Sequence, residues 1–184
     1  FHIWRIIIHH NFKVEKSIIK RELNSPSDKK VLDFGCGVGQ YSVLFKPENY
    51  TGIDLDIIHI NFAKKNFKGK FFKSRPNKID FPNNRFDFIM VLAVLHHISD
   101  EDLYKILKEF KRVIKPKGKI LIIDHFTRKY QRNLLANTMV FLDRGKFFRD
   151  ANNLCLRCSK FFKIDKKYFI KTGPYKDYVI VLSK

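Results

Sequence analysis

The sequence has few cysteines and no long apolar run. Three cysteines, unevenly spaced, are too few for a disulfide framework, which favours a reducing compartment. The longest apolar run, residues 88–95, falls far short of the roughly 20 residues that a bilayer-spanning helix needs. The apolar stretch 6–8 is also too short for the core of a secretory signal. We therefore expect a cytoplasmic protein without a transmembrane segment.

Acidic residues are scarce relative to basic ones. The chain has 37 Lys and Arg against 18 Asp and Glu, a formal net charge of +19. A field of that sign attracts phosphate, nucleic acid or an anionic membrane surface. However, most of the excess is lysine spread along the chain, whereas specific readers of phosphates and bases favour arginine. A nucleic-acid partner and a set of merely solvated lysines therefore both stand as interpretations.

Length and pattern indicate one globular α/β domain. With 184 residues, 45% apolar and 30% charged, the chain can bury a sizeable core. Short continuous apolar runs alternate with helical patterns, as in βαβ units whose parallel sheet is covered on both faces. The expected parallel strands are residues 30–34, 50–54, 70–73, 86–92 and 119–124.

The clearest helix is expected between the last two of these strands. Ser99 and Asp102 form a capping box, and a one-sided apolar pattern follows until the turn signal at residues 115–118. Further elements are expected on both sides: helices over residues 1–24, 56–67, 128–142 and 151–158, and strands over 160–169 and 177–182. The signal Gly173-Pro174 makes the last two strands an antiparallel pair.

The most informative stretch follows the first expected strand. Glycines at alternate positions, Gly35, Gly37 and Gly39, allow a sharp turn and let a ligand approach the backbone amides, and a helix is expected from about Gln40. A dinucleotide fingerprint would need glycine at Gln40, and a P-loop would need a Gly-Lys-Ser/Thr end. Asp33 ends the strand, where a carboxylate would repel a pyrophosphate but suit a ligand that bears a cation.

A second carboxylate, Asp54, closes the next strand nineteen residues after Gly35. It can accept two hydrogen bonds from a ribose diol there. Singly, such an Asp is more often a helix cap or turn residue. Together with Asp33 around the glycine loop, it predicts a nucleoside ligand with a positively charged tail and no phosphates.

With these residues in place, the sequence resembles the class I S-adenosylmethionine-dependent methyltransferases of the small-molecule type. Residues 33–39 resemble the first motif of that family, and residues 52–56 resemble the second. Residues 86–98 resemble its fourth-strand motif, and residues 110–120 the turn into its fifth strand. The likeness covers about residues 31–124 and extends less specifically to the final strand pair.

The resemblance implies a Rossmann-like, seven-stranded, mostly parallel sheet with an antiparallel last strand and helices on both faces. It divides the single domain, residues 1–184, into four parts. These are an N-terminal helical cap (1–28), a cofactor-binding core (29–124), a helical substrate-cover segment (125–159) and the final antiparallel strand pair (160–184).

The resemblance also implies S-adenosylmethionine as cofactor. By this resemblance, the methionine moiety would be held by Asp33, Gly35 and Gly37. Asp54 would bind the ribose hydroxyls and Leu55 the adenine edge, and Leu92 and Ala93 would close the pocket. Many relatives carry an acidic residue after the third strand that faces the adenine amino group, and here the carbonyl oxygen of Asn77 would take that contact. The full expected set is Asp33, Gly35, Cys36, Gly37, Gly39, Tyr41, Asp54, Leu55, Asn77, Leu92 and Ala93, with no metal.

Histidines follow the fourth and fifth expected strands, at the sheet edge where open α/β sheets bind ligands. Methyl transfer relies on positioning, and a base helps only when the acceptor holds a proton at neutral pH. His125 is the expected base, with a hydrogen-bonded structural histidine as the alternative. His96 and His97 fit packing or cofactor contact as well as catalysis.

Two segments near the C-terminus have competing interpretations. Cys155 and Cys158 have metal-ligand spacing but no second pair, so buried apolar packing is expected instead of a zinc site. Residues 143–149 combine basic and aromatic side chains, which would suit either an anionic or flat substrate or a turn with a buried phenylalanine pair.

The resulting hypothesis is a methyltransferase for a small-molecule or lipid-like acceptor. An RNA methyltransferase is the alternative that the charge suggests, although the chain lacks the Asn/Asp-Pro-Pro-aromatic element and the Pro-Cys pair of RNA-modifying relatives. A third reading is a non-catalytic module that binds nucleic acid or a partner protein, against which the intact Asp33 and Asp54 argue. The sequence leaves the acceptor and the oligomeric state open.

Overall fold

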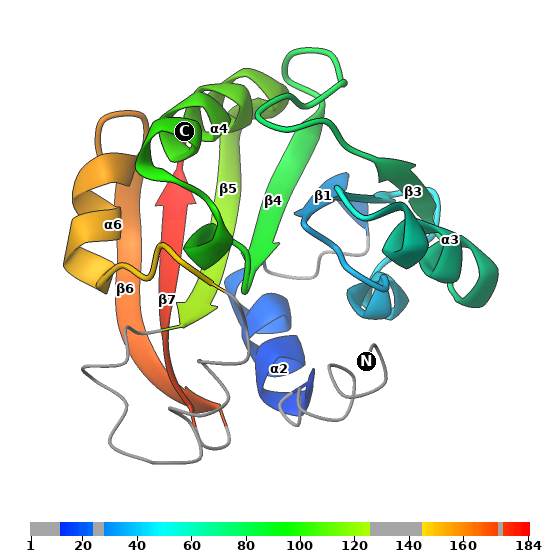
Figure 1. Ribbon diagram of the computed structural model, residues 1–184, viewed down its shortest axis with the longest axis horizontal. Coiled ribbons are helices and arrows are strands. Elements are labelled where there is room, and N and C mark those ends of the chain that lie inside the picture. The colour runs from blue at the N-terminus through cyan, green and yellow to red at the C-terminus, as the bar shows by residue number, and fades with distance from the viewer. Residues whose placement is uncertain (1–11, 24–27, 126–144, 173–174) are drawn as a thin grey trace.

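The computed structural model describes residues 12–23, 28–125, 145–172 and 175–184. Seven strands form one sheet with helices on both faces (Figure 1). The strands are β1 (Val31–Phe34), β2 (Tyr50–Asp54), β3 (Lys70–Lys73), β4 (Phe86–Leu92), β5 (Ile114–His125), β6 (Lys163–Thr172) and β7 (Tyr175–Ser183). The helices are α2 (Phe12–Glu22), α3 (Ile57–Asn66), α4 (Asp100–Val113) and α6 (Ala151–Cys158), with short 3-10 helices η2 (Gln40–Leu44) and η3 (Leu95–His97).

The strand order is β3-β2-β1-β4-β5-β7-β6. The strand β1 pairs in parallel with both β2 and β4, so the chain reverses its direction of winding there. The last strand, β7, runs antiparallel between β5 and β6. These pairings confirm the expected Rossmann-like, mostly parallel sheet with an antiparallel last strand. In such sheets, ligands bind at the carboxyl edge near the point of reversal.

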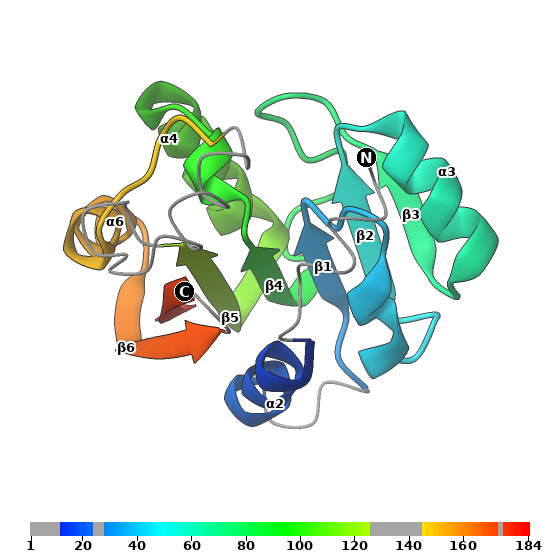
Figure 2. The same ribbon diagram turned by 60° about the horizontal axis from the view of Figure 1, so that its bottom comes forward.

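Each face of the sheet has its own apolar core. Phe110 of α4 and Leu154 of α6 are fully buried in one core. Ile19 of α2 and Ile60 of α3 are fully buried in the other. Figure 2 shows α2 on the opposite side of the central strands from α4 and α6. Among the residues that the structure describes, no helix has the length and apolar character to cross a bilayer.

The helix α4 forms as its sequence predicts. The Ser99 hydroxyl accepts a hydrogen bond from the backbone N–H of Asp102 at 3.2 Å, which confirms the capping role of Ser99. Acidic residues occupy the first turn, and Lys111 and Arg112 occupy the last, so both ends complement the helix dipole.

Several elements differ from the expected boundaries. The strand β5 begins at Ile114, because the expected turn at residues 115–118 bulges within the strand, where Lys117 has φ 64°. The strand β6 begins at Lys163, because residues 159–162 continue the end of α6 as a turn. The helix expected from Gln40 is a five-residue 3-10 helix. The helix expected at 128–142 and the turn at 173–174 lie outside the described residues.

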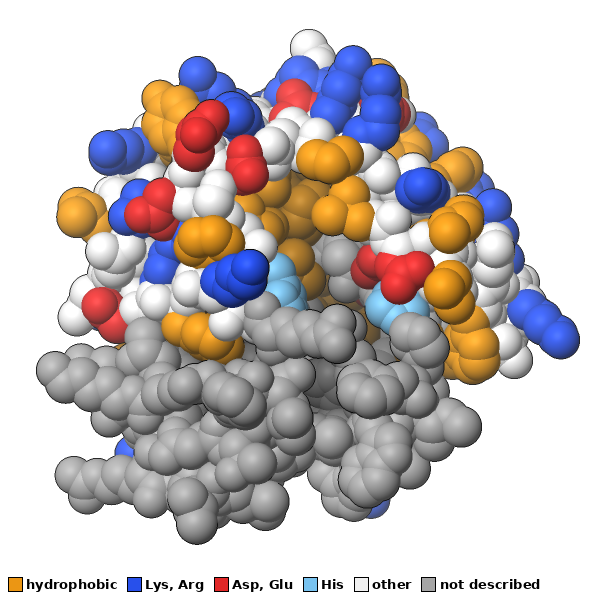
Figure 3. Space-filling model, in the orientation of Figure 1, with side chains coloured by type: hydrophobic (Ala, Val, Ile, Leu, Met, Phe, Trp, Pro, Cys, Tyr) orange, Lys and Arg blue, Asp and Glu red, His pale blue; other side chains and the backbone are white. Residues whose placement is uncertain are grey.

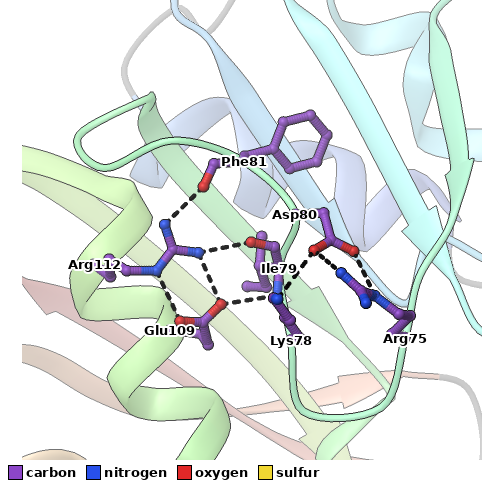
Figure 4. A network of polar contacts seen from close by, with 7 residues as sticks. All are labelled: Arg75, Lys78, Ile79, Asp80, Phe81, Glu109 and Arg112. Atoms are coloured by element: carbon purple, nitrogen blue, oxygen red, sulfur yellow. Dashed lines mark hydrogen bonds and ion pairs between the residues drawn. The ribbon is translucent and has the colours of Figure 1, made fainter.

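The loop between β3 and β4 is fastened to α4 by Arg112. Its guanidinium donates hydrogen bonds to the carbonyl oxygens of Ile79 (2.6 Å) and Phe81 (2.7 Å) and pairs with Glu109 at 2.8 Å (Figure 4). Glu109 also accepts a hydrogen bond from the backbone N–H of Ile79 at 2.9 Å. These side chains satisfy backbone groups that no neighbouring strand reaches.

We expect Arg112→Ala to lower the free energy of unfolding by about 2 kcal/mol, because the carbonyl oxygens of Ile79 and Phe81 lose charge-assisted partners. Lys111→Ala, at the exposed neighbouring position, should change it by less than about 0.5 kcal/mol. Urea unfolding followed by circular dichroism measures both values, and equal effects would contradict a clamping role for Arg112.

Candidate functional site

A cavity of about 480 Å³ opens at the carboxyl edge of the sheet. Its walls come from the segments that follow β1, β2, β3 and β4, with contributions from α2, α3 and α4. Figure 3 shows the hollow, with acidic and histidine side chains at its rim. The volume suits a small molecule or cofactor. Nine residues of the expected set line it: Gly35, Cys36, Gly37, Tyr41, Asp54, Leu55, Asn77, Leu92 and Ala93.

The glycine loop needs its glycines for different reasons. Gly35 has φ 75°, and a Cβ there would lie 2.5 Å from Val94, so no other residue fits without displacement. A Cβ on Gly37 would meet nothing within 4 Å, so this stretch of backbone lies open to the cavity. Gly39 does not line the cavity. A Cβ there would lie 2.7 Å from Phe71, so this glycine serves the packing of the loop on the sheet.

The Asp54 carboxylate joins two segments of the cavity wall. Its Oδ2 accepts a hydrogen bond from the backbone N–H of Gly37 at 2.8 Å, and its Oδ1 accepts one from the N–H of Asp56 at 2.9 Å. Asp56 in turn caps the N-terminus of α3. A carboxylate has roughly four acceptor positions, so these two bonds leave it able to accept hydroxyl groups from a ligand.

Asp33 lies elsewhere than expected. Its carboxyl group is buried beside Tyr50, whose hydroxyl donates a hydrogen bond to it at 2.5 Å, and it does not line the cavity. Asp33 is the third residue of a strand that is buried on both faces, so its side chain points into the protein layer rather than past the strand end. Burial and the nearby Asp54 raise the pKa of Asp33, and the hydrogen bond from Tyr50 lowers it. Burial is the largest effect, so the pKa rises to about 7.

The loop after β3 presents Asn77 to the cavity in a positive-φ conformation, at 58°. Its Nδ2 donates a hydrogen bond to the Asp102 Oδ1 at 2.6 Å. The hydrogen bond with Ser99, followed by those from Asn77 and Lys105, lowers the pKa of Asp102, so Asp102 accepts as a carboxylate. This contact fixes the amide orientation of Asn77 and leaves its carbonyl oxygen available on the other side. Asp102, known from sequence only as a capping residue, thus also lines the cavity.

Glu15 and His59 also line the cavity, although neither was expected there from the sequence. Glu15 of α2 is buried and accepts a hydrogen bond from the Tyr41 hydroxyl. Burial and this carboxylate raise the pKa of Tyr41. His59 of α3 lies 3.7 Å from the Asp54 Oδ1. Both Glu15 and His59 are polar residues on the otherwise apolar face of an expected helix, and this is the sequence feature that could have identified them.

The structure separates the three candidate histidines. His97 lines the cavity. His96 is buried, with its Nδ1 at 2.5 Å from the Asp124 Oδ1 and its ring stacked on Phe148. His125 is the last residue of β5 and pairs with Asp177, but its side chain lies outside the described residues. Its role as a base stays a prediction.

Arg149 does not face the cavity as a substrate-gripping residue would. It is buried and donates hydrogen bonds to the carbonyl oxygens of Leu95 (2.8 Å) and Ile98 (2.6 Å), so its cationic group is committed to holding η3. None of the described residues between 145 and 159 lines the cavity.

Cys158 is buried in the core beneath α6, and Cys155 is partly buried against it. Within the described part of the chain, no group of three or more His, Cys, Asp or Glu side chains could hold a metal. Their burial in and against the apolar core gives these two cysteines a packing role.

Comparison with known proteins agrees with this geometry. The methyltransferase domain family matches residues 7–161. Phosphoethanolamine N-methyltransferase 3 of Arabidopsis thaliana is 34% identical over 106 residues, which cover 53% of this chain and 21% of that protein. The fatty-acid O-methyltransferase of Mycolicibacterium smegmatis is 33% identical over 103 residues, covering 52% and 37%. The chain spans less than half the length of the curated relatives it matches.

The fold also matches solved structures. The crystal structure of the PH0226 protein from Pyrococcus horikoshii OT3 aligns with a TM-score of 0.74 at 20% sequence identity. The alignment covers 93% of this chain and 89% of that one. The two proteins therefore share the fold across nearly the whole chain.

The raised pKa of Asp33 predicts how stability depends on pH. Between the ordinary value of 3.8 and about 7, the folded state holds a proton that the unfolded state has released. The contribution of Asp33 to the free energy of unfolding therefore falls as pH rises through this window, by up to about 1.4 kcal/mol per pH unit. Asp33→Asn should remove this slope, whereas Asp28→Asn, at an exposed site, should keep it. Urea unfolding at a series of pH values measures this, and parallel curves for wild type and Asp33→Asn would contradict it.

Proposed function

Because this chain belongs to the methyltransferase domain family, we propose that it transfers the methyl group of S-adenosylmethionine to a small-molecule or lipid-like acceptor. The observation that carries the proposal is the Asp54 carboxylate, which is hydrogen-bonded to the open glycine loop inside a cavity at the sheet's point of reversal. A ribose diol is the ligand group that such a carboxylate recognises.

The rest of the cavity wall fits the same cofactor. Glu15, Asp54 and Asp56 give the wall a negative character, which suits a sulfonium and an ammonium group. Leu55 and Ala93 add apolar surface for an adenine ring. The open backbone at Gly37 leaves room where a side chain would otherwise project.

Bound S-adenosylmethionine would supply a methyl group on a positively charged sulfur, and the neutral thioether that remains after transfer is an excellent leaving group. The task left to the chain is to hold cofactor and acceptor in line. The residue after β4 helps to fix the shape of the cavity wall. Ala93 has φ 53°, and its N–H donates a hydrogen bond to the Ile123 carbonyl oxygen at 2.8 Å. His125 stays the predicted base for acceptors that carry a proton, and His97 is a second candidate because it lines the cavity.

Two observations support a small acceptor over RNA. The cavity has a volume of small-molecule size, and the two relatives above are named for a phosphoethanolamine and a fatty-acid acceptor. The net charge of +19 supports the RNA alternative. No described feature of the cavity supports a non-catalytic module.

Asp54→Ala should weaken binding of S-adenosylhomocysteine by at least about tenfold, because a charge-assisted hydrogen bond to the ribose is lost. Isothermal titration calorimetry measures this, with Asp28→Ala as an exposed carboxylate control. Methyl transfer is tested by incubating the protein with isotopically labelled donor and a cell extract. Label in the small-molecule or lipid fraction supports the proposal, label in RNA favours the alternative, and a wild-type protein that binds neither S-adenosylmethionine nor its product overturns it.

The Asn77–Asp102 contact should set the preference for adenine, because it turns the Asn77 carbonyl oxygen toward an amino group. Wild-type protein should bind S-adenosylhomocysteine about tenfold more tightly than the analogue with hypoxanthine in place of adenine. Asp102→Ala should reduce this ratio, whereas Glu101→Ala removes the same charge from the same helix end without touching the cavity. Calorimetric titration of both ligands gives the ratio, and an unchanged ratio in Asp102→Ala would exclude this role.

A further inference from the structure

The helix α3 carries apolar side chains on the face turned to solvent. Ile58 is 60% exposed and Phe62 is 43% exposed, and they lie one helical turn apart. Leu55, just before the helix, is 57% exposed. The inner face of the same helix buries Ile60 and Ala63 completely. A surface helix normally has one apolar side, so the exposed set Leu55, Ile58 and Phe62, the α3 stripe, needs a separate explanation.

The surroundings of the α3 stripe are basic. The chain has no acidic residue between Asp56 and Asp80. Five exposed lysines lie on α3, on β3 and in the turn between them: Lys64, Lys65, Lys68, Lys70 and Lys73. Figure 3 shows hydrophobic side chains gathered over this part of the molecule, next to the rim of the hollow. An apolar stripe with a lysine border is the composition of a helix that lies in the interface of an anionic bilayer.

The α3 stripe also adjoins the mouth of the cavity. Leu55 belongs to both, because it lines the cavity and is more than half exposed. Asp56 and His59, which precede and follow Ile58 on the chain, line the cavity as well. A surface that covered the α3 stripe would therefore meet the cavity rim.

We propose that the α3 stripe docks this protein on an anionic membrane surface. Apolar side chains would enter the headgroup boundary, and the lysines around them would meet anionic lipid. A second copy is a poorer occupant, because its five lysines would face five like charges. Nucleic acid is poorer too, because residues 57–73 include no arginine and would leave the apolar stripe unsatisfied.

Membrane docking would present a lipid-like acceptor at the cavity rim. This consequence rests on the proposed function, whereas membrane binding itself does not. The two are therefore measured separately, by vesicle binding without cofactor and by calorimetry without vesicles.

The test of the α3 stripe is cosedimentation of the full chain with vesicles of phosphatidylcholine that contain phosphatidylserine. The double variant Ile58→Ser, Phe62→Ser should bind at least about tenfold more weakly than wild type. The control Leu156→Ser, Phe169→Ser removes two similarly exposed apolar side chains, at 68% and 60%, from α6 and β6 at the other end of the sheet, and should bind as wild type does. Circular dichroism verifies the fold of each variant.

The test of the lysines keeps the net charge matched. A triple variant should weaken vesicle binding by more than about tenfold. It combines Lys64→Gln, Lys65→Gln and Lys68→Gln. Lys108→Gln, Lys111→Gln, Lys117→Gln removes the same charge from exposed positions outside the patch and should have a much smaller effect. Vesicles of phosphatidylcholine alone should bind the wild type weakly.

Several outcomes overturn the proposal. These are no binding of the wild type, equal binding to neutral and anionic vesicles, unchanged binding of the α3 stripe variant, or a dimer by analytical ultracentrifugation that this variant dissociates. The α3 stripe variant should still bind S-adenosylhomocysteine. If the wild type does not bind that compound, the proposed function fails while the vesicle result stands on its own.

Discussion

The site depends on the Asp54 carboxylate, which ties the glycine loop after β1 to the first turn of α3 after β2. Parallel strands deliver these two segments side by side, and the backbone N–H groups of Gly35 and Cys36 donate to the Ile53 carbonyl oxygen of β2, at 2.8 and 3.0 Å. The Asp54 side chain accepts two further backbone N–H bonds, one from each segment, and its remaining acceptor capacity faces the cavity. The same contact therefore shapes the site and places a carboxylate in the cavity wall.

Side chains that bind backbone groups also hold other segments of the cavity wall in place. Arg112 binds carbonyl oxygens of the loop after β3, and Arg149 binds carbonyl oxygens at the two ends of η3. Irregular segments have no strand partners for their backbone, so long cationic side chains from packed neighbouring segments take that place. Arg149, which lies in a segment expected to suit either an anionic substrate or a turn, thus acts as a structural support, as Arg112 does.

The fold and most of the expected residues that line the cavity were accessible from sequence, because their signals are local. Apolar runs, Ser99 and the spaced glycines each specify nearby backbone conformation, and Asp54 is placed by the end of its strand. The bulge in β5 was not accessible, because the register is set by pairing with β4 across the bulge at Lys117. The burial of Asp33 and the part played by Glu15 and Asp102 depend on residues far away in the chain, which no local pattern specifies.

The sequence by itself determined the class of fold, the position of the site at the strand ends and the predicted kind of ligand. Only the tertiary structure decided which polar side chains face the cavity, which are buried supports, and that α3 leaves Ile58 and Phe62 exposed. The physical reason is that periodicity shows which residues share a face of an element, whereas burial depends on what packs against that face. In α3 both faces are apolar, and packing against the sheet covers one of them.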